Sequence, residues 1–141
     1  MKNLFLSICS GVLFAFSWVD TGFFPLVFFA FIPLLTLENN LCKLNKRNSF
    51  VLFGYSFLSF FLFNIVTTYW IWHASIAGAF AAFVVNALLM SLVIVLFHNA
   101  KKNLGTFKGY LSLIFFWISM EYLHLNWELA WPWLTLGNVF A

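Results

Sequence analysis

The sequence has very little charge. Only 8% of its 141 residues are Asp, Glu, Lys or Arg, whereas a typical soluble domain has about 25%. A soluble domain of this size needs a polar shell, and seven Lys/Arg with four Asp/Glu cannot supply one. The same scarcity excludes a disordered chain and a nucleic-acid-binding domain, so we expect no nucleic-acid partner. The abundance of apolar residues (64%, including 21 Phe and 7 Trp) predicts an integral membrane protein.

Cysteine and recognisable catalytic motifs are also scarce. Cys9 lies in an apolar run and Cys42 in a Lys-rich segment, so we expect no disulfide between them. Bulky Ile8 before Cys9 argues against a lipidated cysteine. The sequence has no Gly-rich phosphate loop, no metal-ligand spacing and no nucleophile motif, and we expect neither a metal nor a cofactor. Three histidines near span ends are expected to form interfacial hydrogen bonds rather than to bind ligands: His73, His98 and His124.

The apolar runs predict the architecture. A membrane-spanning helix needs about 20 apolar residues, and on this basis the chain is expected to be an all-α, polytopic transmembrane helical bundle. It would have about five spans and the start of a sixth, within one N-terminal transmembrane domain over residues 1–141. The expected spans are residues 4–19, 23–37, 50–72, 76–97 and 110–125, with a partial run at 131–141. Polar residues predict loops at 38–49 and 101–108. Because the last run is too short to cross a bilayer, we expect the sequence to be cut short.

The positions of the cations predict the topology. Five crossings place Lys2, the 43–47 segment and the 101–108 segment on one side, which accounts for all seven Lys and Arg residues. Because cations collect in cytoplasmic loops, this pattern predicts a cytoplasmic N-terminus. The opposite side would then receive Asp20 and an interfacial belt of aromatic residues: Trp70, Trp72, Trp127, Trp131 and Trp133.

The segment around Glu121 is the strongest candidate for function. On a helix, Trp117, Glu121 and His124 share one face. An ionisable side chain near the end of a span is a functional hypothesis by default. Glu121 could line a substrate cavity or orient the outer loop, or it could serve only as a structural hydrogen-bonding partner. Small residues every four positions predict a packing seam, at Ala74, Gly78, Ala82 and Asn86. Asn64, Thr67 and Thr68 are expected to bond across helices rather than to line a polar cleft.

Four short segments occur in an order that resembles a known family. They are Phe23-Phe24-Pro25-Leu26, Tyr69-Trp70-Ile71-Trp72, Trp117 with Glu121-Tyr122-Leu123, and Trp131-Pro132-Trp133-Leu134 with Gly137. This set is similar to the membrane region of bacterial apolipoprotein N-acyltransferase. His124 stands where the family usually has Arg, so a role that depends on that Arg is not carried over.

The resemblance implies a membrane bundle joined to a periplasmic nitrilase-like domain with a Glu-Lys-Cys triad. Its thiolate takes an acyl chain from a phospholipid, and the α-amine of a lipoprotein's diacylglyceryl-cysteine attacks the thioester. The implied partners are a phospholipid acyl donor, a diacylated apolipoprotein acceptor and membrane lipid, at the bacterial inner membrane. The triad would lie downstream of Ala141, so this chain is expected to have no catalytic residue and no activity alone. The expected lipid-lining residues are Tyr69, Trp72, Trp117, Glu121, Pro132 and Trp133.

Two alternatives from other classes stay open at this point. A transporter fragment would need charges facing a pore, or inverted repeats with broken helices. The sequence shows no repeat, and Glu121 is the ionisable residue expected inside a span. A purely structural membrane protein is the other alternative.

Overall fold

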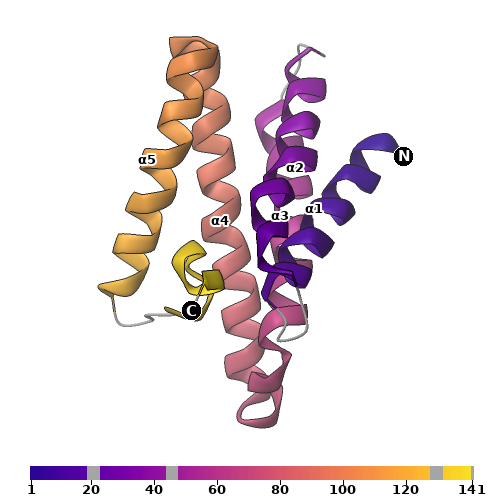
Figure 1. Cartoon of the computed structure of the whole chain (residues 1–141), viewed down its shortest axis with the longest axis vertical. Coiled ribbons are helices and arrows are strands. Elements are labelled where there is room, and N and C mark those ends of the chain that lie inside the picture. The colour runs from indigo at the N-terminus through magenta and orange to yellow at the C-terminus, as the bar shows by residue number, and fades with distance from the viewer. Residues whose placement is uncertain (19–22, 44–47, 128–131, 141) are drawn as a thin grey trace.

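The computed structural model describes residues 1–18, 23–43, 48–127 and 132–140, and every regular element among them is helical. The described residues form five α-helices, which Figure 1 labels: α1 (Lys2–Trp18), α2 (Val27–Cys42), α3 (Asn48–Thr68), α4 (Ile76–Leu104) and α5 (Thr106–Leu125). Four short 3-10 helices accompany them: η1 (Phe24–Leu26), η2 (Tyr69–His73), η3 (Pro132–Leu134) and η4 (Leu136–Phe140). The predicted all-α bundle is confirmed.

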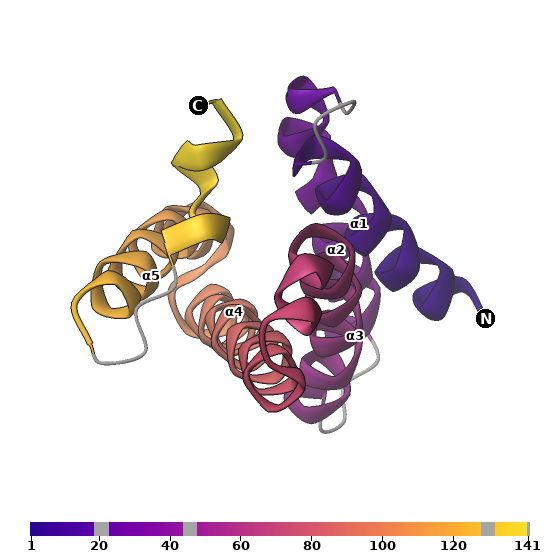
Figure 2. The same cartoon turned by 90° about the horizontal axis from the view of Figure 1, so that it is seen from below.

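The helices pack in a simple order around α4. Helices α1, α2 and α3 form one group, α3 packs along α4, and α5 packs along the other side of α4. Seen from below, α5 and the α1–α3 group lie on opposite sides of α4 (Figure 2). The C-terminal segment, η3 and η4, extends from the side of α5 toward α1 and η1.

A chain of aromatic rings forms the core. Phe14 of α1 packs edge-on against Phe31 of α2, with ring centroids 4.8 Å apart, and contacts Phe60 and Phe63 of α3 at 5.7 and 5.5 Å. Trp117 of α5 closes the chain, at 5.0 Å from Phe31 and 5.7 Å from Phe60. Edge-to-face pairs of this kind add stability beyond the area they bury, so these rings join four helices.

Small polar residues hold α1 close to α3. The Ser7 hydroxyl donates to the Tyr55 carbonyl at 2.6 Å, and the Ser59 hydroxyl donates to the Ser7 carbonyl at 2.6 Å. A Cβ at Gly11 would lie 2.5 Å from the Ser59 carbonyl oxygen. Small residues thus let the two backbones approach, as they do in membrane helix pairs.

The surface and the helix lengths fit a membrane protein. Within the described ranges, three helical segments are long and apolar enough to span a bilayer: Phe24–Cys42, Ser49–His73 and Ile76–Leu104. Helix α1 is a shorter apolar helix. Large apolar side chains lie on the outside, such as Phe50 (83% exposed), Phe107 (77%) and Phe115 (68%). Hydrocarbon, rather than water, is the medium in which such a surface is favourable.

The helices are longer than the sequence predicts at the polar segments. Helix α2 continues to Cys42, so the loop predicted from residue 38 is wrong for its first part, and Glu38 is fully buried. Helix α4 continues to Leu104, and Gly105, with a φ of +85°, makes the turn into α5 alone. That conformation favours glycine because it has no Cβ. The loop predicted at 101–108 is therefore also wrong.

The end of the chain differs from a continuing span. Residues 132–140 form η3 and η4, not an α-helix. Several sequence predictions concern positions outside the described residues: Val19, Asp20, Lys46, Arg47, Glu128, Trp131 and Ala141.

The cations of the described residues fall at one end of the bundle. The C-terminal end of α2, which Lys43 follows, lies at the same end as the last turn of α4 with Lys101 and Lys102 (Figure 1). Helix α1 runs opposite to α2, which directs its first residues toward that end. Element η2 and the C-terminal segment lie toward the other end. This separation agrees with the predicted topology, while the compartment that each end faces stays a prediction.

Candidate functional site

Glu121 ties α5 to the C-terminal segment. Its Oε1 accepts a hydrogen bond from the Trp117 indole Nε1, one turn earlier on α5, at 2.8 Å. The same oxygen accepts the backbone N–H of Leu136 at 2.8 Å. Trp117 is 5% exposed and Glu121 is half-buried. The predicted shared face of Trp117 and Glu121 is confirmed, and the Glu121 carboxylate accepts hydrogen bonds from two donors.

Trp133 lies where three parts of the chain meet. Its ring packs edge-on against Trp70 of η2, with centroids 5.9 Å apart, and its carbonyl accepts the indole N–H of Trp18 at 3.4 Å. At the far end of the segment, Phe140 contacts Phe24 of η1 at 5.8 Å. The C-terminal segment therefore bridges α5 to α1, η1 and η2, and Trp133 itself stays 54% exposed.

A pocket lies beside η2, between α3 and α4. Its volume is about 300 Å³, within the range of small-molecule sites. Exposed Tyr69 and Trp72 belong to its wall, and nearly all of its lining is apolar. The lining residues are Phe61, Ile65, Tyr69, Trp72, His73, Phe80 and Phe83. Such a pocket suits a hydrocarbon chain better than a polar ligand.

A larger groove of about 470 Å³ lies between α4 and α5. It is apolar along most of its length and polar at the end where His124, Asn126 and Trp127 lie. The His124 ring is 5.3 Å from the Trp127 ring. His124 is 8% exposed, and neither of its ring nitrogens has a hydrogen-bond partner among the described residues. The prediction of an interfacial hydrogen bond at His124 is therefore wrong for the part of the chain described.

The lipid-lining candidates whose side chains the structure describes do not fall in one pocket. Trp117 and Glu121 are bonded to each other, Trp133 packs on η2, and Tyr69 and Trp72 line the pocket beside η2. Pro132 is the first residue of η3, and its side chain lies outside the described part of the chain.

Two predictions about helix packing are corrected in part. Thr67 and Thr68 donate to carbonyls one turn earlier on α3, not across to a neighbouring helix. The Asn64 amide donates to the Phe60 carbonyl at 2.8 Å and also reaches across to the Met90 Sδ of α4 at 4.0 Å, so the predicted bond across helices is confirmed for Asn64. Such back-bonding competes with interhelical bonds because the local carbonyl is always within reach. The predicted small-residue seam is also wrong at its start, because Ala74 and Gly78 are exposed.

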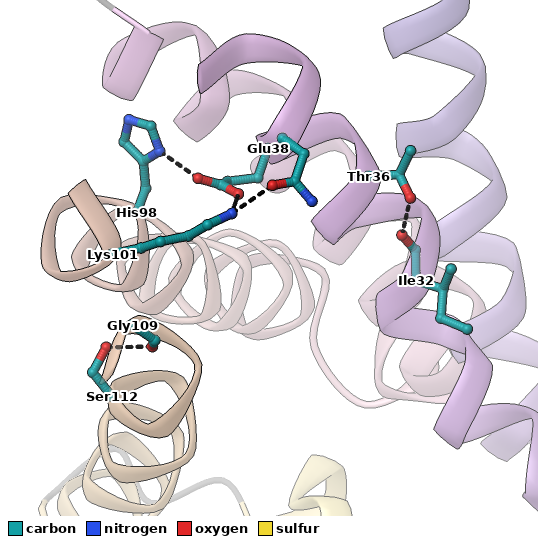
Figure 3. A network of polar contacts seen from close by, with 8 residues as sticks. Ile32, Thr36, Glu38, His98, Lys101, Gly109 and Ser112 are labelled. Carbon is teal, nitrogen blue, oxygen red and sulfur yellow. Dashed lines mark hydrogen bonds and ion pairs between the residues drawn. The ribbon is translucent and has the colours of Figure 1, made fainter. Parts of the chain in front are cut away.

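The sequence interpretation missed a buried charged cluster at the cationic end. Glu38 Oε1 lies 2.7 Å from His98 Nδ1, and Glu38 Oε2 accepts from Lys101 Nζ at 2.6 Å (Figure 3). The same ammonium lies 2.6 Å from the Asn39 Oδ1. The available signal was helical periodicity: Glu38 follows buried Leu34 by four residues, on the face that α2 turns inward.

Comparison with known proteins identifies the family. A family model described as the apolipoprotein N-acyltransferase N-terminal domain matches residues 10–141. The chain belongs to this family. It is 30% identical over 141 residues to a protein of Chlorobaculum tepidum named apolipoprotein N-acyltransferase, which covers 97% of this chain. The chain spans about a quarter of that relative's length (25%). No solved structure matches the chain significantly.

The family assignment confirms the resemblance and sets its scope. This chain is an N-terminal domain of the apolipoprotein N-acyltransferase family and a helical membrane protein. The match covers residues 10–141 and therefore includes the charged cluster around Glu38, the pocket beside η2 and the hydrogen bond from the Leu136 N–H to Glu121.

Proposed function

We propose that this chain is the membrane platform of an apolipoprotein N-acyltransferase. It would hold the acyl chains of a phospholipid donor and of a diacylated apolipoprotein acceptor beneath a catalytic domain encoded downstream of Ala141. The family match over residues 10–141 supports this role. Both implied substrates are anchored in the bilayer by hydrocarbon chains, so the enzyme has to receive them at a membrane surface.

In the proposed reaction, a cysteine thiolate of the downstream domain attacks a phospholipid ester. The ester bond breaks, a thioester forms and a lysophospholipid leaves. The α-amine of the diacylglyceryl-cysteine then attacks the thioester, which forms an amide and releases the thiol. Covalent catalysis of this kind divides one difficult transfer into two easier steps. The contribution of the present chain is to position the acyl chains, and bond breaking belongs to the downstream groups.

The observation that carries the proposal is the make-up of the end opposite the cations. An apolar pocket with Tyr69 and Trp72 in its wall lies there, next to the C-terminal segment with Trp133. Glu121 fixes that segment to α5 through the Leu136 N–H. If the cations mark the cytoplasmic side, this apolar and aromatic end lies at headgroup depth on the outer side. An apolar surface at that depth can hold the acyl chains of both proposed substrates.

The test uses protein expressed from the complete gene, purified and supplied with phospholipid and a diacylated lipopeptide. Mass spectrometry measures the fraction of peptide that gains a third acyl chain. Glu121→Ala and Trp133→Ala should each lower the rate about tenfold or more, which corresponds to roughly 1.4 kcal/mol of lost positioning. Membrane insertion and helix content should be retained, because neither residue belongs to the buried aromatic core.

Matched controls separate positioning from general damage. Glu121→Gln keeps an acceptor oxygen for the Leu136 N–H and should retain most of the activity. Phe115→Ala removes an aromatic ring that is 68% exposed on α5 and should leave the rate unchanged. Unchanged acylation in both Glu121→Ala and Trp133→Ala would contradict the proposal and favour a purely structural role for this end.

A further inference from the structure

A carboxylate, a thiol and an imidazole meet at the cationic end of the bundle. Glu38 and Cys42 lie one turn apart on α2, and His98 approaches them from α4. One ligand atom from each lies within 4.8 Å of the other two. Glu38 and His98 are buried and point toward each other (Figure 3), whereas Cys42 is exposed at the helix end. The cluster thus combines a fixed interior with access from outside.

We propose that Glu38, Cys42 and His98 form a zinc-binding site. Zinc prefers cysteine, histidine and carboxylate ligands, with bonds of about 2.0–2.3 Å, so ligand atoms in a tetrahedral site lie roughly 3.3–3.6 Å apart. Here the His98 Nδ1 and Glu38 Oε1 are 2.7 Å apart, and all three ligand atoms fall within 4.8 Å. Small side-chain rotations therefore reach the required spacing. Three protein ligands leave a fourth position for water.

Lys101 is the natural competitor for this site. Its ammonium occupies the Oε2 side of Glu38 and leaves Oε1 on the side of His98. Lys101 keeps other partners if the carboxylate turns to a metal, because its Nζ lies 2.6 Å from the Asn39 Oδ1. The Nζ also lies over the rings of Phe97 and Tyr110, at 5.6 and 5.3 Å from their centroids, in cation–π geometry.

The charge balance is also favourable. Binding releases the thiol proton of Cys42 to water, because only the thiolate binds the metal. The Zn²⁺ charge is then balanced by the Cys42 thiolate and the Glu38 carboxylate, while His98 binds as the neutral imidazole. Lys101 remains as one cation at a membrane surface that already carries Lys102 and Lys43. This site lies at the opposite end from the proposed lipid platform and does not depend on that proposal.

The experiment measures metal binding on protein from the complete gene, in nanodiscs, after removal of metals with a chelator. Titration with Co²⁺, followed by displacement with Zn²⁺, reports a thiolate-to-cobalt charge-transfer band and an affinity. Cys42→Ser should remove the part of that band that this site contributes, and His98→Gln should weaken binding at this site by about tenfold or more. Cys9→Ser, the other cysteine of the chain, should change nothing.

Lys101→Gln separates a metal site from a simple ion pair. Removal of the competing ammonium should raise the cobalt affinity if Glu38 is a ligand. Equal cobalt binding and an equal band in wild type and Cys42→Ser would overturn the proposal, and so would an unchanged or lower affinity in Lys101→Gln. Circular dichroism checks that each variant keeps its helix content. Cys42 is exposed at the end of α2, so its replacement by serine leaves the buried packing intact.

Discussion

Replacement of Glu121 by alanine should release the C-terminal segment from α5. The Glu121 Oε1 accepts two hydrogen bonds, from the Trp117 indole and from the Leu136 backbone N–H. The bond to Trp117 joins residues of the same helix, whereas the bond to Leu136 joins α5 to η4. Only the second bond therefore contributes directly to docking of the segment.

The structure sets the size of the effect. A hydrogen bond to a charged group contributes about 1.5–3 kcal/mol, and each 1.4 kcal/mol changes an opening equilibrium about tenfold. Loss of the Leu136 bond should therefore speed local opening roughly 10-fold to 150-fold. The edge-to-face contacts of Trp133 with Trp70 and of Phe140 with Phe24 remain in the variant, so the segment should loosen rather than detach.

Hydrogen–deuterium exchange with mass spectrometry measures this opening in peptides that cover residues 136–140. Exchange should rise by the predicted factor in Glu121→Ala and by less than about tenfold in Glu121→Gln, which retains a neutral acceptor worth about 0.5–1.5 kcal/mol. Buried amides of α4, such as that of Ala87, supply the internal reference and should not change. Equal exchange of the 136–140 peptides in wild type and Glu121→Ala would refute the reasoning.

Two further predictions concern helix packing and topology. Gly11→Ala should destabilise the bundle by about 1–3 kcal/mol in thermal unfolding, because the new Cβ would lie 2.5 Å from the Ser59 carbonyl oxygen. The control Gly54→Ala should be tolerated, because nothing lies within 4 Å of a Cβ at that position. Equal stability of the two variants would contradict the close approach of α1 to α3. In a background without native cysteines, a cysteine that replaces exposed Gly137 should react with an impermeant maleimide added outside the cell. A cysteine that replaces exposed Lys102 should react only after permeabilisation. The reverse labelling pattern would show that the predicted topology is wrong.

Local sequence patterns predict much of the helical layout. Predominantly apolar runs long enough to cross a bilayer force the backbone to satisfy its own hydrogen bonds, so α3 and α4 follow from composition. The contact between Trp117 and Glu121 follows from four-residue spacing on one helix. In both cases the cause lies within a single helix, where periodicity in the sequence is informative.

The Glu38 cluster could not be predicted in the same way. Asn39, Asn40 and Lys43 beside Glu38 favour a loop by composition. The helix continues because Glu38 finds His98 and Lys101 on α4, more than 60 positions away in the case of Lys101. Such a partner becomes visible only when the packing of α4 is known. The positions of Lys and Arg near the span ends predicted at which end of the bundle the cluster lies, but they did not predict that Glu38 is buried.

For the candidate site, the sequence indicates the end of the bundle at which the residues lie but not the contacts that they make. Topology alone brings Tyr69, Trp72, Glu121 and Trp133 toward one end. Their division into a pocket beside η2 and a tie on α5 depends on how η3 and η4 fold back, and no sequence pattern indicated two 3-10 helices there. Those contacts come from tertiary packing, which overrides local expectation.

Directional bonds have a particular value in this bundle. Lipid tails are as apolar as leucine, so apolar contact alone discriminates weakly between alternative helix registers in a membrane. The two described carboxylates of the chain each join separate elements: Glu38 joins α2 to α4, and Glu121 joins α5 to η4. The Ser59 hydroxyl does the same between α3 and α1. The sequence has only four acidic residues, and two of them bond to a separate element. If one of these helices shifted by one turn along its neighbour, the carboxylate and its partner would no longer meet. The few polar groups therefore select one register among packings that the aromatic rings alone would tolerate.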